Sequence, residues 1–477
     1  MSYAFIGSYF LSPYLSRFGE ALNLAAVNVE TSRPERPTTQ DPADPNPDLD
    51  AVQAKTGAAA DSGVRPPAPY QLIRSANVGM TAIVLFARRP AAIHHIQAAE
   101  CGFGVADMGN KGAAGLRVTY ADEGLSSTSP GGQRTTELTF VATHLAPMEW
   151  NLKRRNANWR SIAGGLTFRN PKDVVEGLGP GPGLAGRLRD SAASAPRSPE
   201  EDAEDEGSRE WLLRRGEEDL AEHHDTLRDI SIFRPTSHLF VAGDLNYRIA
   251  SKTPPPLASF PSLRDGPDHW SAFLERDQLT RERLAGRTLH GLSEAPIAFP
   301  PTYKYELVEG DDAAADRDGT DGDLDWKWAA HRWPSWTDRV LYLAVPGWAR
   351  RRRGAPDLDV AVRAYGSLPL MRSSDHQGVY FRAAVPLLGA ADLAAPGDEG
   401  ADGGAALQGD EADDPRVRLP VPIDVDAWGR RAAARRREIM AGWSMFLWST
   451  REGAVLIGTV LLTGVASWWL WQSFFLV

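Results

Sequence analysis

Cysteine is nearly absent from this chain, since one residue, Cys101, occurs among 477. A single thiol excludes an intramolecular disulfide framework and fits a reducing compartment such as the cytosol. A basic start is also missing, because the first 16 residues contain no Lys or Arg, and this argues against a secretory signal peptide. Internal repeats and a glycine-rich nucleotide-binding loop are lacking as well, so a Rossmann unit is not expected.

Basic residues are almost absent from three short acidic segments. Residues 200–206, 309–325 and 398–414 together hold 21 Asp or Glu and one Arg, a net −20 within a chain whose total is −10. The remaining residues therefore sum to +10. A basic body suits a polyanionic ligand or an anionic membrane surface, and the acidic segments are expected to be solvated loops.

Formal charge is absent from the last 25 residues, 453–477, which are long enough to cross a bilayer as a helix. A buried core helix is the alternative, but the run is apolar on all sides. The segment "RRAAARRRE" at 430–438 supplies the basic flank expected on the cytosolic side, and Trp468, Trp469 and Trp471 suit the opposite interface. We therefore predict a C-terminal membrane anchor, with the rest of the chain facing the cytosol.

Short apolar runs alternate with helical patterns along the chain. Runs of Val, Ile, Leu, Phe and Thr predict strands, and apolar residues at helical spacing predict helices. The expected strands are 78–87, 114–120, 137–143, 238–243, 337–345 and 377–385, and the expected helices are 148–164, 209–231 and 268–286. This alternation predicts a layered α/β domain with mixed sheets.

One predicted strand ends in polar residues that a core would not choose. In "HLFVAGDLNYRIA", residues 238–250, the strand runs into Asp244, Asn246 and Arg248. An ordinary turn is one interpretation, since Gly, Asp and Asn favour turns. The other uses the two-residue period of an extended chain, which directs Asp244 and Asn246 to the same side. A base and an orienting amide placed there could share one water.

Five further strand ends carry polar groups of the same kind. Taken singly, each has a simpler interpretation as a turn, a satisfied buried histidine or a surface ion pair. Taken together, they bring carboxylates for a hard cation, imidazoles, and cations for phosphate. The stretches are "GNKGAAG" (109–115) with Lys111, "FVATHLAP" (140–147) with His144, "FPPTYKYEL" (299–307) with Tyr303 and Lys304, "HRWPSWTDRVLYL" (331–343) with Asp338 and Arg339, and "SSDHQGVYF" (373–381) with Asp375 and His376.

These groups together are the ones that hydrolysis of a phosphoester requires. A phosphate dianion repels hydroxide, so catalysis needs a metal and cations to neutralise it and a base to deliver the attacking water in line. Magnesium prefers oxygen ligands and usually keeps several waters, which accounts for carboxylates in place of a Cys or His cage. The cofactor that the sequence predicts is Mg²⁺.

The same motifs, in this order, resemble those of the inositol polyphosphate 5-phosphatases, a branch of the endonuclease/exonuclease/phosphatase superfamily, in a fungal-type form. The resemblance runs from about Leu72 to Ala384, and "GDLNYR", "TYKY" and "WTDRVL" are its most specific landmarks. It implies an α/β fold, a four-layer α/β/β/α sandwich of two mixed sheets with the active site where the sheets open. The sequence adds one C-terminal transmembrane helix to this fold.

The resemblance also implies a role for each residue. Asp244 would be the base for the attacking water, and Asn246 its orienting partner. His376 would contact the scissile phosphate and be held by Asp338, while His144 would stabilise charge in the transition state. The implied metal residue is Asp375, and the implied substrate-binding group is Lys111, Arg248, Tyr303, Lys304, Lys327 and Arg332, with Tyr303 and Lys304 at the neighbouring 4-phosphate.

Two parts of the family pattern have no counterpart here, a first strand with an Asn and a second strand ending in a metal-binding Glu. The candidates Asn23, Asn28 and Glu30 in "LNLAAVNVE" differ in spacing and order. One sheet is therefore expected to lack strands near its centre, and the metal its principal carboxylate. We interpret the chain as an incomplete gene product in which Met1 is internal; a genuine start at Met1 predicts a weak or inactive enzyme.

The leading hypothesis is a membrane-tethered, Mg²⁺-dependent phosphatase that removes the 5-phosphate from phosphoinositides such as phosphatidylinositol 4,5-bisphosphate. Tethering raises the effective concentration of a lipid substrate, and "RRRR" at 350–353 adds basic character. The alternative is a catalytically weak or inactive pseudophosphatase that binds phosphoinositides as a tethered adaptor. A nuclease or sphingomyelinase of the same superfamily would not need "PTYKY" or "WTDRVL", so no nucleic-acid partner is expected.

These inferences divide the chain into six parts. The predicted parts are a remnant of the catalytic domain at 1–30, a flexible insertion at 31–69, the phosphatase domain at 70–387 with disordered insertions near 121–134, 171–206 and 309–324, an acidic linker at 388–428, a basic juxtamembrane segment at 429–452 and the transmembrane anchor at 453–477.

Overall fold

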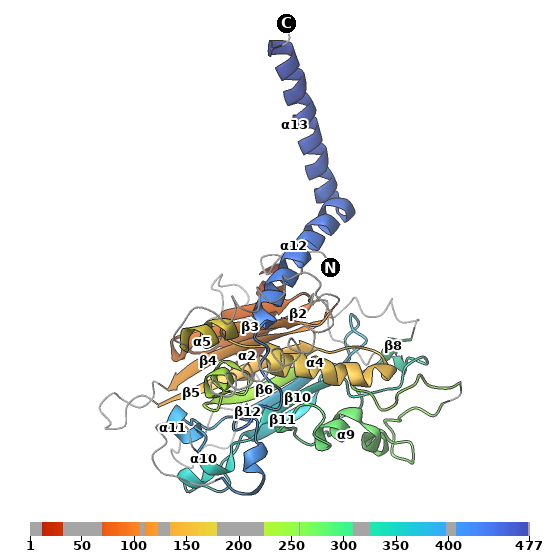
Figure 1. Ribbon diagram of the computed structural model, residues 1–477. Helices are drawn as coiled ribbons and strands as arrows, with labels where there is room; N and C mark the ends of the chain where they lie inside the picture. Colours follow the sequence, from red (N-terminus) through yellow and green to blue (C-terminus); the bar gives the residue numbers. More distant parts are fainter. Residues whose placement is uncertain are drawn as a thin grey trace, which may run out of the picture.

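Figure 1 shows the computed structural model, which describes residues 12–31, 69–104, 109, 111–122, 134–178, 224–256, 258–308, 325–396 and 407–475. A six-stranded sheet lies at the centre, in the order β3-β4-β5-β6-β10-β7. Only β5 and β6 are parallel, so this sheet is mixed, as predicted. Its strands are β3 (Ile93–Gly102), β4 (Gly112–Asp122), β5 (Arg134–His144), β6 (Ser237–Asp244), β7 (Leu292–Ser293) and β10 (Asp338–Leu343).

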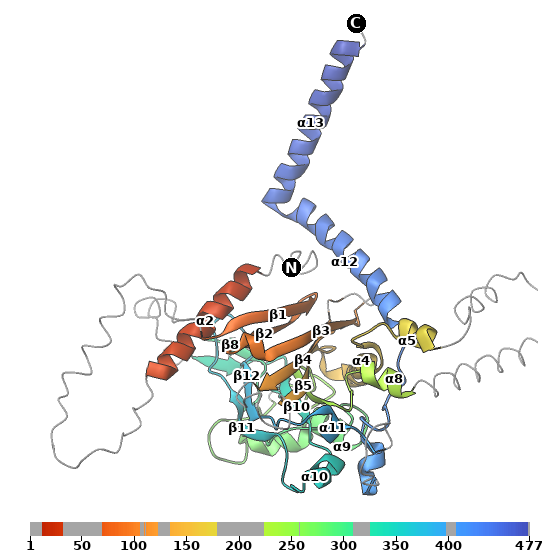
Figure 2. The same ribbon diagram turned by 90° about the vertical axis from the view of Figure 1, so that its left-hand side faces the viewer.

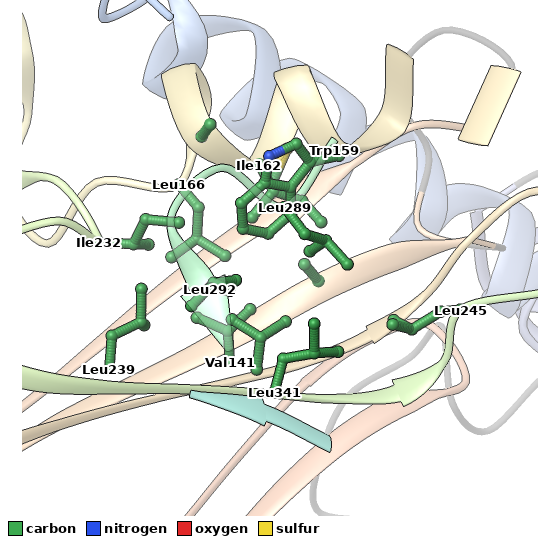
Figure 3. Close-up of a cluster of buried hydrophobic side chains, with 14 of the residues drawn as sticks. Val141, Trp159, Ile162, Leu166, Ile232, Leu239, Leu245, Leu289, Leu292 and Leu341 are labelled. Carbon is green, nitrogen blue, oxygen red and sulfur yellow. The ribbon is translucent and has the colours of Figure 1, made fainter. Parts of the chain in front are cut away.

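One face of the central sheet is covered by helices. Strands β5 and β6 direct Val141 and Leu239 to this side, where α4 (Leu152–Gly165) supplies Trp159 and Ile162 (Figure 3). Both α4 side chains are fully buried, and each such burial stabilises the fold by roughly 1.5–3 kcal/mol. The short helices α5 (Pro171–Leu178) and α8 (His224–Ile230) lie beside α4 (Figure 2).

The opposite face of the sheet is covered by two separate antiparallel hairpins. They are β1 (Gln71–Val78) with β2 (Thr81–Ala87), and β11 (Ala361–Ser367) with β12 (Val379–Ala384). The Phe381 ring of β12 lies 6.4 Å from the Phe240 ring of the sheet, while β1 and β2 contact β4 and β5. Among the described residues no strand joins the hairpins, so this layer is open where the sequence predicts missing strands.

The fourth layer is α2 (Ser12–Thr31), which packs on the outside of the first hairpin. Its Phe18 ring lies 5.8 Å from Phe86 of β2, and Asn23 Oδ1 accepts a hydrogen bond from Tyr70 N at 2.8 Å. The layers therefore run α2, hairpins, central sheet and α4 (Figure 2), which confirms the predicted α/β/β/α order. Asn23 and Asn28 lie on this helix, whereas the family pattern places its Asn on a strand.

Shorter elements connect these layers. They are η2 (Pro90–Ala92), η4 (Glu149–Asn151), η5 (Trp270–Arg276), α9 (Gln278–Leu284), β8 (Tyr305–Leu307), β9 (Trp326–Trp328), α10 (Gly347–Arg352), α11 (Ala390–Leu393) and η6 (Gly409–Asp413). Strands β8 and β9 form a small antiparallel hairpin, and its loop 309–324 lies outside the described residues.

Part of the segment predicted as an acidic linker, 388–428, belongs to the folded body. Leu388 and Leu393 pack with Trp348, and Ile423 packs with Leu227. The prediction was based on the high content of Asp and Glu and gave too little weight to the apolar residues between them. The linker prediction is therefore wrong for the buried residues of 388–396 and 407–428, which pack on the body. Residues 397–406 lie outside the described part of the chain.

Two helices end the chain, α12 (Ala427–Ser449) and α13 (Arg451–Phe475), and they rise from the body with a bend between them (Figure 1). The span Arg451–Phe474 has a mean hydropathy of 1.7 and is long and apolar enough to cross a membrane. Since only 6% of it is buried, α13 is not a core helix of the described body.

Each predicted strand is present, with ends displaced by a few residues. The strands that were not predicted are β1, β3, β7, β8, β9 and β11. The predicted helices 148–164 and 268–286 correspond to η4 with α4 and to η5 with α9. Several predicted segments lie wholly or mainly outside the described residues: 1–11, 32–68, 123–133, 179–206, the 209–223 part of a predicted helix, and 309–324.

Candidate active site

Three strand ends meet at one edge of the central sheet and carry acidic and imidazole groups. His144 ends β5 and is paired in register with Asp244, which ends the parallel strand β6. Asp338 begins the antiparallel strand β10 and is also paired with Asp244. The sheet thereby brings together residues that are far apart in the sequence, with Asp244 in the middle.

Asp244 and Asn246 form the predicted pair. Asn246 Nδ2 donates to Asp244 Oδ2 at 3.0 Å, and the backbone N of Asn246 donates to Asp244 Oδ1 at 3.0 Å. Asn246 has φ 56°, a left-handed conformation in which Asn is enriched. The turn interpretation is confirmed, and it is the turn that directs the amide onto the carboxylate, since Asn246 lies beyond the end of β6 and is not extended. The water shared by the two groups stays a prediction.

The surroundings of Asp244 keep it ionised. Burial raises the pKa of its carboxyl. The contact with His144 Nε2 at 3.1 Å and the charges of His376 and Arg248 together outweigh burial, so the pKa lies below its usual value. An ionised carboxylate at the end of a strand can accept a proton from water.

Asp338 holds the imidazole of His376, which lies in the loop before β12. His376 Nδ1 is 2.9 Å from Asp338 Oδ2, and the same oxygen accepts hydrogen bonds from Thr302 at 2.7 Å and Thr337 at 2.8 Å. Burial lowers the pKa of His376, but the bond to Asp338 and its charge outweigh burial and raise the pKa above its usual value. With Nδ1 engaged, Nε2 is the nitrogen that a ligand can contact.

Cationic and aromatic side chains surround this centre. Lys111 Nζ is 3.1 Å from His144 Nδ1, and burial lowers the pKa of Lys111 against the attraction of Asp244. Arg248 is 2% exposed, donates to the side-chain oxygen of Asn246 and covers the Tyr303 ring at 4.4 Å. The Tyr303 ring lies 4.4 Å from that of His376, so the two halves of the site are in contact.

A third acidic side chain, Asp375, lies at the rim and is paired with Lys304. Their N–O distance is 2.7 Å, and this bond raises the pKa of Lys304. Burial raises the pKa of Asp375, but the bond from Lys304 outweighs it, so the pKa is lowered. Asp375, predicted beside a metal, has a lysine as its partner.

Two predicted substrate-binding residues lie farther out. Lys327 is exposed on β9, opposite Glu306, and Arg332 Nη1 is 3.8 Å from Glu149 Oε2. The family resemblance grouped them with the other substrate-binding residues, whereas the contacts of the structure join a smaller group. That group is Lys111, His144, Asp244, Asn246, Arg248, Tyr303, Lys304, Asp338, Asp375 and His376.

Sequence reasoning missed three supporting residues. Thr302 and Thr337 are fully buried and donate to Asp338, and each adjoins a motif residue, which is the only sequence signal for them. Glu149 is also fully buried, and neither carboxylate oxygen has a hydrogen-bond partner in the described part of the chain. Its nearest cation is Arg332, so this pair links the loop after β5 to the loop after β9.

The acidic residues do not form a closed metal site. Among the described residues, no three or more His, Cys, Asp or Glu side chains are grouped so that they could hold a metal ion. Asp244, Asp338 and Asp375 each already accept hydrogen bonds from protein groups. Only an ion that takes most of its ligands from water or from a bound phosphate fits this donor set.

Comparisons with known proteins place this region among the phosphatases. The family described as Endonuclease/Exonuclease/phosphatase family 2 matches residues 50–382. Inositol-1,4,5-trisphosphate 5-phosphatase 1 of Schizosaccharomyces pombe is 26% identical over 315 residues, which is 65% of this chain and 19% of that protein. Type IV inositol polyphosphate 5-phosphatase 3 of Arabidopsis thaliana is 42% identical over 101 residues, 21% of this chain and 13% of that protein.

One solved structure was also similar, the inositol polyphosphate 5-phosphatase domain of a synaptojanin in complex with inositol (1,4)-bisphosphate and a calcium ion. It aligns with a TM-score of 0.40 and 25% identity, covering 66% of this chain and 62% of that one. The aligned region spans less than a fifth of the length of the two curated relatives.

Proposed function

The chain belongs to endonuclease/exonuclease/phosphatase family 2, and on that premise we propose that it is a phosphatase that removes the 5-phosphate from phosphoinositides. The observation that carries the proposal is the convergence of Asp244–Asn246 and Asp338–His376 at one sheet edge. One pair presents an ionised carboxylate and the other a cationic imidazole, the polarity that attack of water on a phosphate requires.

Asp244 is placed to take a proton from the attacking water. Asn246 Nδ2 donates both to Asp244 and to the carbonyl of Leu145, at 3.2 Å, while Arg248 engages the Asn246 oxygen. The amide is therefore fixed on every side before a substrate arrives. Because this fixed amide donates to the Asp244 carboxylate, the carboxylate needs little reorganisation when it takes the proton.

His376 and Lys111 place positive charge beside the position of the phosphate. In phosphoryl transfer, negative charge spreads over the equatorial oxygens, so fixed cations stabilise the transition state. Asp338 keeps His376 protonated by raising its pKa, and His144 lies between Lys111 and Asp244. The His376 proton can also be donated to the departing ring oxygen.

We also propose Mg²⁺ as the cofactor. Mg²⁺ is usually bound by one or two carboxylates together with substrate phosphates and water, and Asp375 with Asp244 could supply that number. When bound, the ion would neutralise phosphate charge. Treatment with EDTA is expected to abolish phosphate release, and added Mg²⁺ to restore it; full activity in EDTA would contradict this.

The substrate-binding group is proposed to read the phosphate next to the scissile one. The centre of the Tyr303 ring is 4.4 Å from the Arg248 guanidinium and 5.6 Å from the Lys304 ammonium. A phosphate at this place would meet two cations and a phenol hydroxyl, which suits the 4-phosphate of a 4,5-bisphosphorylated lipid.

The C-terminal helices are proposed to tether the enzyme to its substrate, with the body on the cytosolic side. Helix α12 has Arg residues in its first half and exposed apolar side chains in its second. The exposed apolar side chains are Met440, Trp443, Met445 and Trp448. Arginines followed by tryptophans are typical of the boundary between cytosol and bilayer, and α13 would continue into the membrane.

A second function, a pseudophosphatase adaptor, is favoured by one observation. The absence of a three-ligand metal group among the described residues leaves the phosphate-binding cations without a closed metal site. Such a protein would bind phosphoinositides through Lys111, Arg248 and Lys304 without turning them over.

The deciding experiment is phosphate release by the full chain in vesicles that contain phosphatidylinositol 4,5-bisphosphate. Asp244→Ala and His376→Ala are expected to reduce release by at least about a hundredfold, the usual contribution of a general acid or base. The matched controls are Asp413→Ala, at an exposed residue, and His224→Ala, at a half-buried residue; both lie outside the site and are expected to keep full activity. Undiminished activity in both site variants would overturn the phosphatase; lipid binding without turnover by the unaltered chain would favour the adaptor.

A further inference from the structure

The first half of α12 is seated on the phosphatase body. The backbone N of Asp424 donates to the carbonyl of Gly164 at 2.9 Å, and Trp428 Nε1 donates to Thr167 Oγ1 at 2.8 Å. These bonds fix the start of α12 against the end of α4. The chain therefore passes from the body into the juxtamembrane helix without a free linker.

A buried ion cluster holds the next turns of α12. Glu438 is 1% exposed, and its Oε2 accepts hydrogen bonds from Arg431 Nη2 at 3.0 Å and Arg435 Nη1 at 3.2 Å. Arg431 Nε is 3.3 Å from Glu100 of the edge strand β3. A buried carboxylate with these partners is expected to be ionised, and the net effect of Arg431 and Arg435 does lower the pKa of Glu438 against its burial.

The other oxygen of Glu438 reaches a loop of the active site. Glu438 Oε1 accepts the backbone N–H of Gly109 at 2.6 Å, across 329 positions of the sequence. Gly109 belongs to the "GNKG" loop, and two residues later Lys111 contacts His144 at 3.1 Å. A hydrogen bond to a charged acceptor is shorter and stronger than a neutral one, so this contact is a firm attachment.

The loop is also confined from its other side. A Cβ on Gly109 would lie 2.4 Å from Val78 Cγ1, and one on Gly112 would lie 2.6 Å from the same methyl. Only glycines allow the loop to lie this close to the first hairpin. Val78 and Glu438 therefore restrain Gly109 from two sides, two positions before Lys111.

The membrane boundary proposed above would lie close to this contact. Met440, Trp443 and Trp448 are exposed and apolar, and Trp443 follows Glu438 by five residues, or about 8 Å along a helix. The same helix thus presents one turn to the active-site loop and the next turns to the bilayer.

We propose that Glu438 is a positioning residue, through which the juxtamembrane helix holds the Lys111 loop in its catalytic position. The inference rests on the proposed phosphatase function and adds a regulatory element to it. Seating of α12 then sets the activity of the site, so the enzyme is fully active only when its membrane helix is docked.

The test compares four forms of the full chain in vesicles that contain phosphatidylinositol 4,5-bisphosphate: unaltered, Glu438→Ala, Lys111→Met and the double variant. Glu438→Ala is expected to lower kcat about tenfold, the factor that corresponds to one lost charge-assisted hydrogen bond. Because Glu438 acts through Lys111, it should cause no further loss in the Lys111→Met background. An equal fractional loss in both backgrounds would overturn the proposal.

Matched variants separate positioning from simple docking. Glu438→Gln keeps an acceptor for Gly109 and is expected to restore most of kcat, whereas Glu438→Asp withdraws the acceptor by one methylene and is not. Glu100→Gln weakens one contact of Arg431 but leaves the Gly109 bond and the Asp424 and Trp428 bonds that dock α12, so it is expected to leave kcat unchanged. If Glu438→Ala does not fold, Glu438→Asp takes its place in the cycle.

Hydrogen exchange of the loop gives a readout that does not depend on turnover. The Gly109 amide is expected to exchange at least about tenfold faster in Glu438→Ala, because its acceptor is gone. Unchanged exchange would overturn the positioning role. An inactive unaltered chain would instead refute the proposed phosphatase, and the exchange comparison would still decide the role of Glu438.

Discussion

At the scale of single residues, the contact between Asp338 and His376 affects the protonation of the imidazole. Burial alone would lower the pKa of His376, and the bond to Asp338 reverses that shift. The pair therefore contributes stability that is complete below the unfolded pKa of about 6.5 and is lost as the pH rises through the raised native value.

The first prediction concerns this pair. Asp338→Asn removes the charge that raises the pKa of His376, so the imidazolium is lost at a lower pH. The alkaline limb of the profile of kcat/KM against pH is expected to move to lower pH, and His376 NMR titration should move in the same direction. Asp413→Asn serves as the control; an unmoved alkaline limb in Asp338→Asn would refute the assigned role.

The second prediction concerns Gly243, which precedes Asp244. Its φ is +142°, and a Cβ there would lie 1.9 Å from the carbonyl oxygen of Thr143 on the neighbouring strand. Gly243→Ala is expected to lower the free energy of unfolding by roughly 2–3 kcal/mol, through strain and displacement of the strand end. Thermal unfolding measures this change. Gly429→Ala, where the added methyl meets nothing within 4 Å, should be neutral or slightly stabilising.

Sequence placed Asp244, Asn246, Asp338 and His376 at or beside strand ends, and the structure brings these four side chains together. Their chemical roles stay predictions. Thr302 and Thr337 could not be predicted in the same way. Their role depends on which oxygen of Asp338 they reach, and that is set by how two loops pack. A threonine beside an aspartate carries no such information in sequence.

At the scale of elements, β10 is anchored by Arg339, next to Asp338 of the candidate site. Its guanidinium is fully buried between Asp277, at 3.0 Å, and Glu294, at 2.6 Å. These two ion pairs fix the start of β10. Asp277 belongs to the loop before α9, and Glu294 to the loop after β7. Arg339 is thus a structural member of the "WTDRVL" motif.

The third prediction follows from this burial. Arg339→Met leaves two buried carboxylates without their cation and is expected to lower the free energy of unfolding by about 3–5 kcal/mol. Arg353→Met, which breaks the exposed pair with Asp392, should change it by less than about 1 kcal/mol. Denaturant unfolding of the two variants makes the comparison, and similar losses would show that burial of Arg339 is not what matters.

Alternating apolar residues predicted the core strands, but not β3. Its sequence begins "IHHIQ", and His94, His95 and Ile96 are exposed because β3 is an edge strand. The docking of α12 on the body could not be predicted from the sequence for another reason. Glu438 follows a run of arginines that reads as a solvated flank, and only the fold brings Gly109 to it.

At the scale of the whole molecule, a four-layer body and a bent pair of helices form one arrangement (Figures 1 and 2). The apolar length of α13 was evident from sequence, since a charge-free run needs no tertiary information. The open second layer was expected from missing motifs. The packing of 407–428 on the body was not, because acidic composition obscured the few side chains that are buried.

The fourth prediction tests the tether. A chain that ends at Ser449 keeps α12 but lacks α13, so it should no longer float with vesicles. Its activity on a short-chain soluble phosphoinositide is expected to stay within about threefold, while activity on vesicles falls at least about tenfold through loss of effective concentration. An unrelated apolar helix in place of residues 451–475 should restore vesicle activity. Equal vesicle activity without any anchor would exclude the tethering role.

The identity of the lipid product is the most direct test of the proposed 5-phosphatase activity. The full chain, in vesicles of phosphatidylinositol 4,5-bisphosphate with Mg²⁺, is predicted to produce phosphatidylinositol 4-phosphate and free phosphate, and Asp244→Ala to produce neither. A product that retains the 5-phosphate, or substrate bound without any release, would contradict the account.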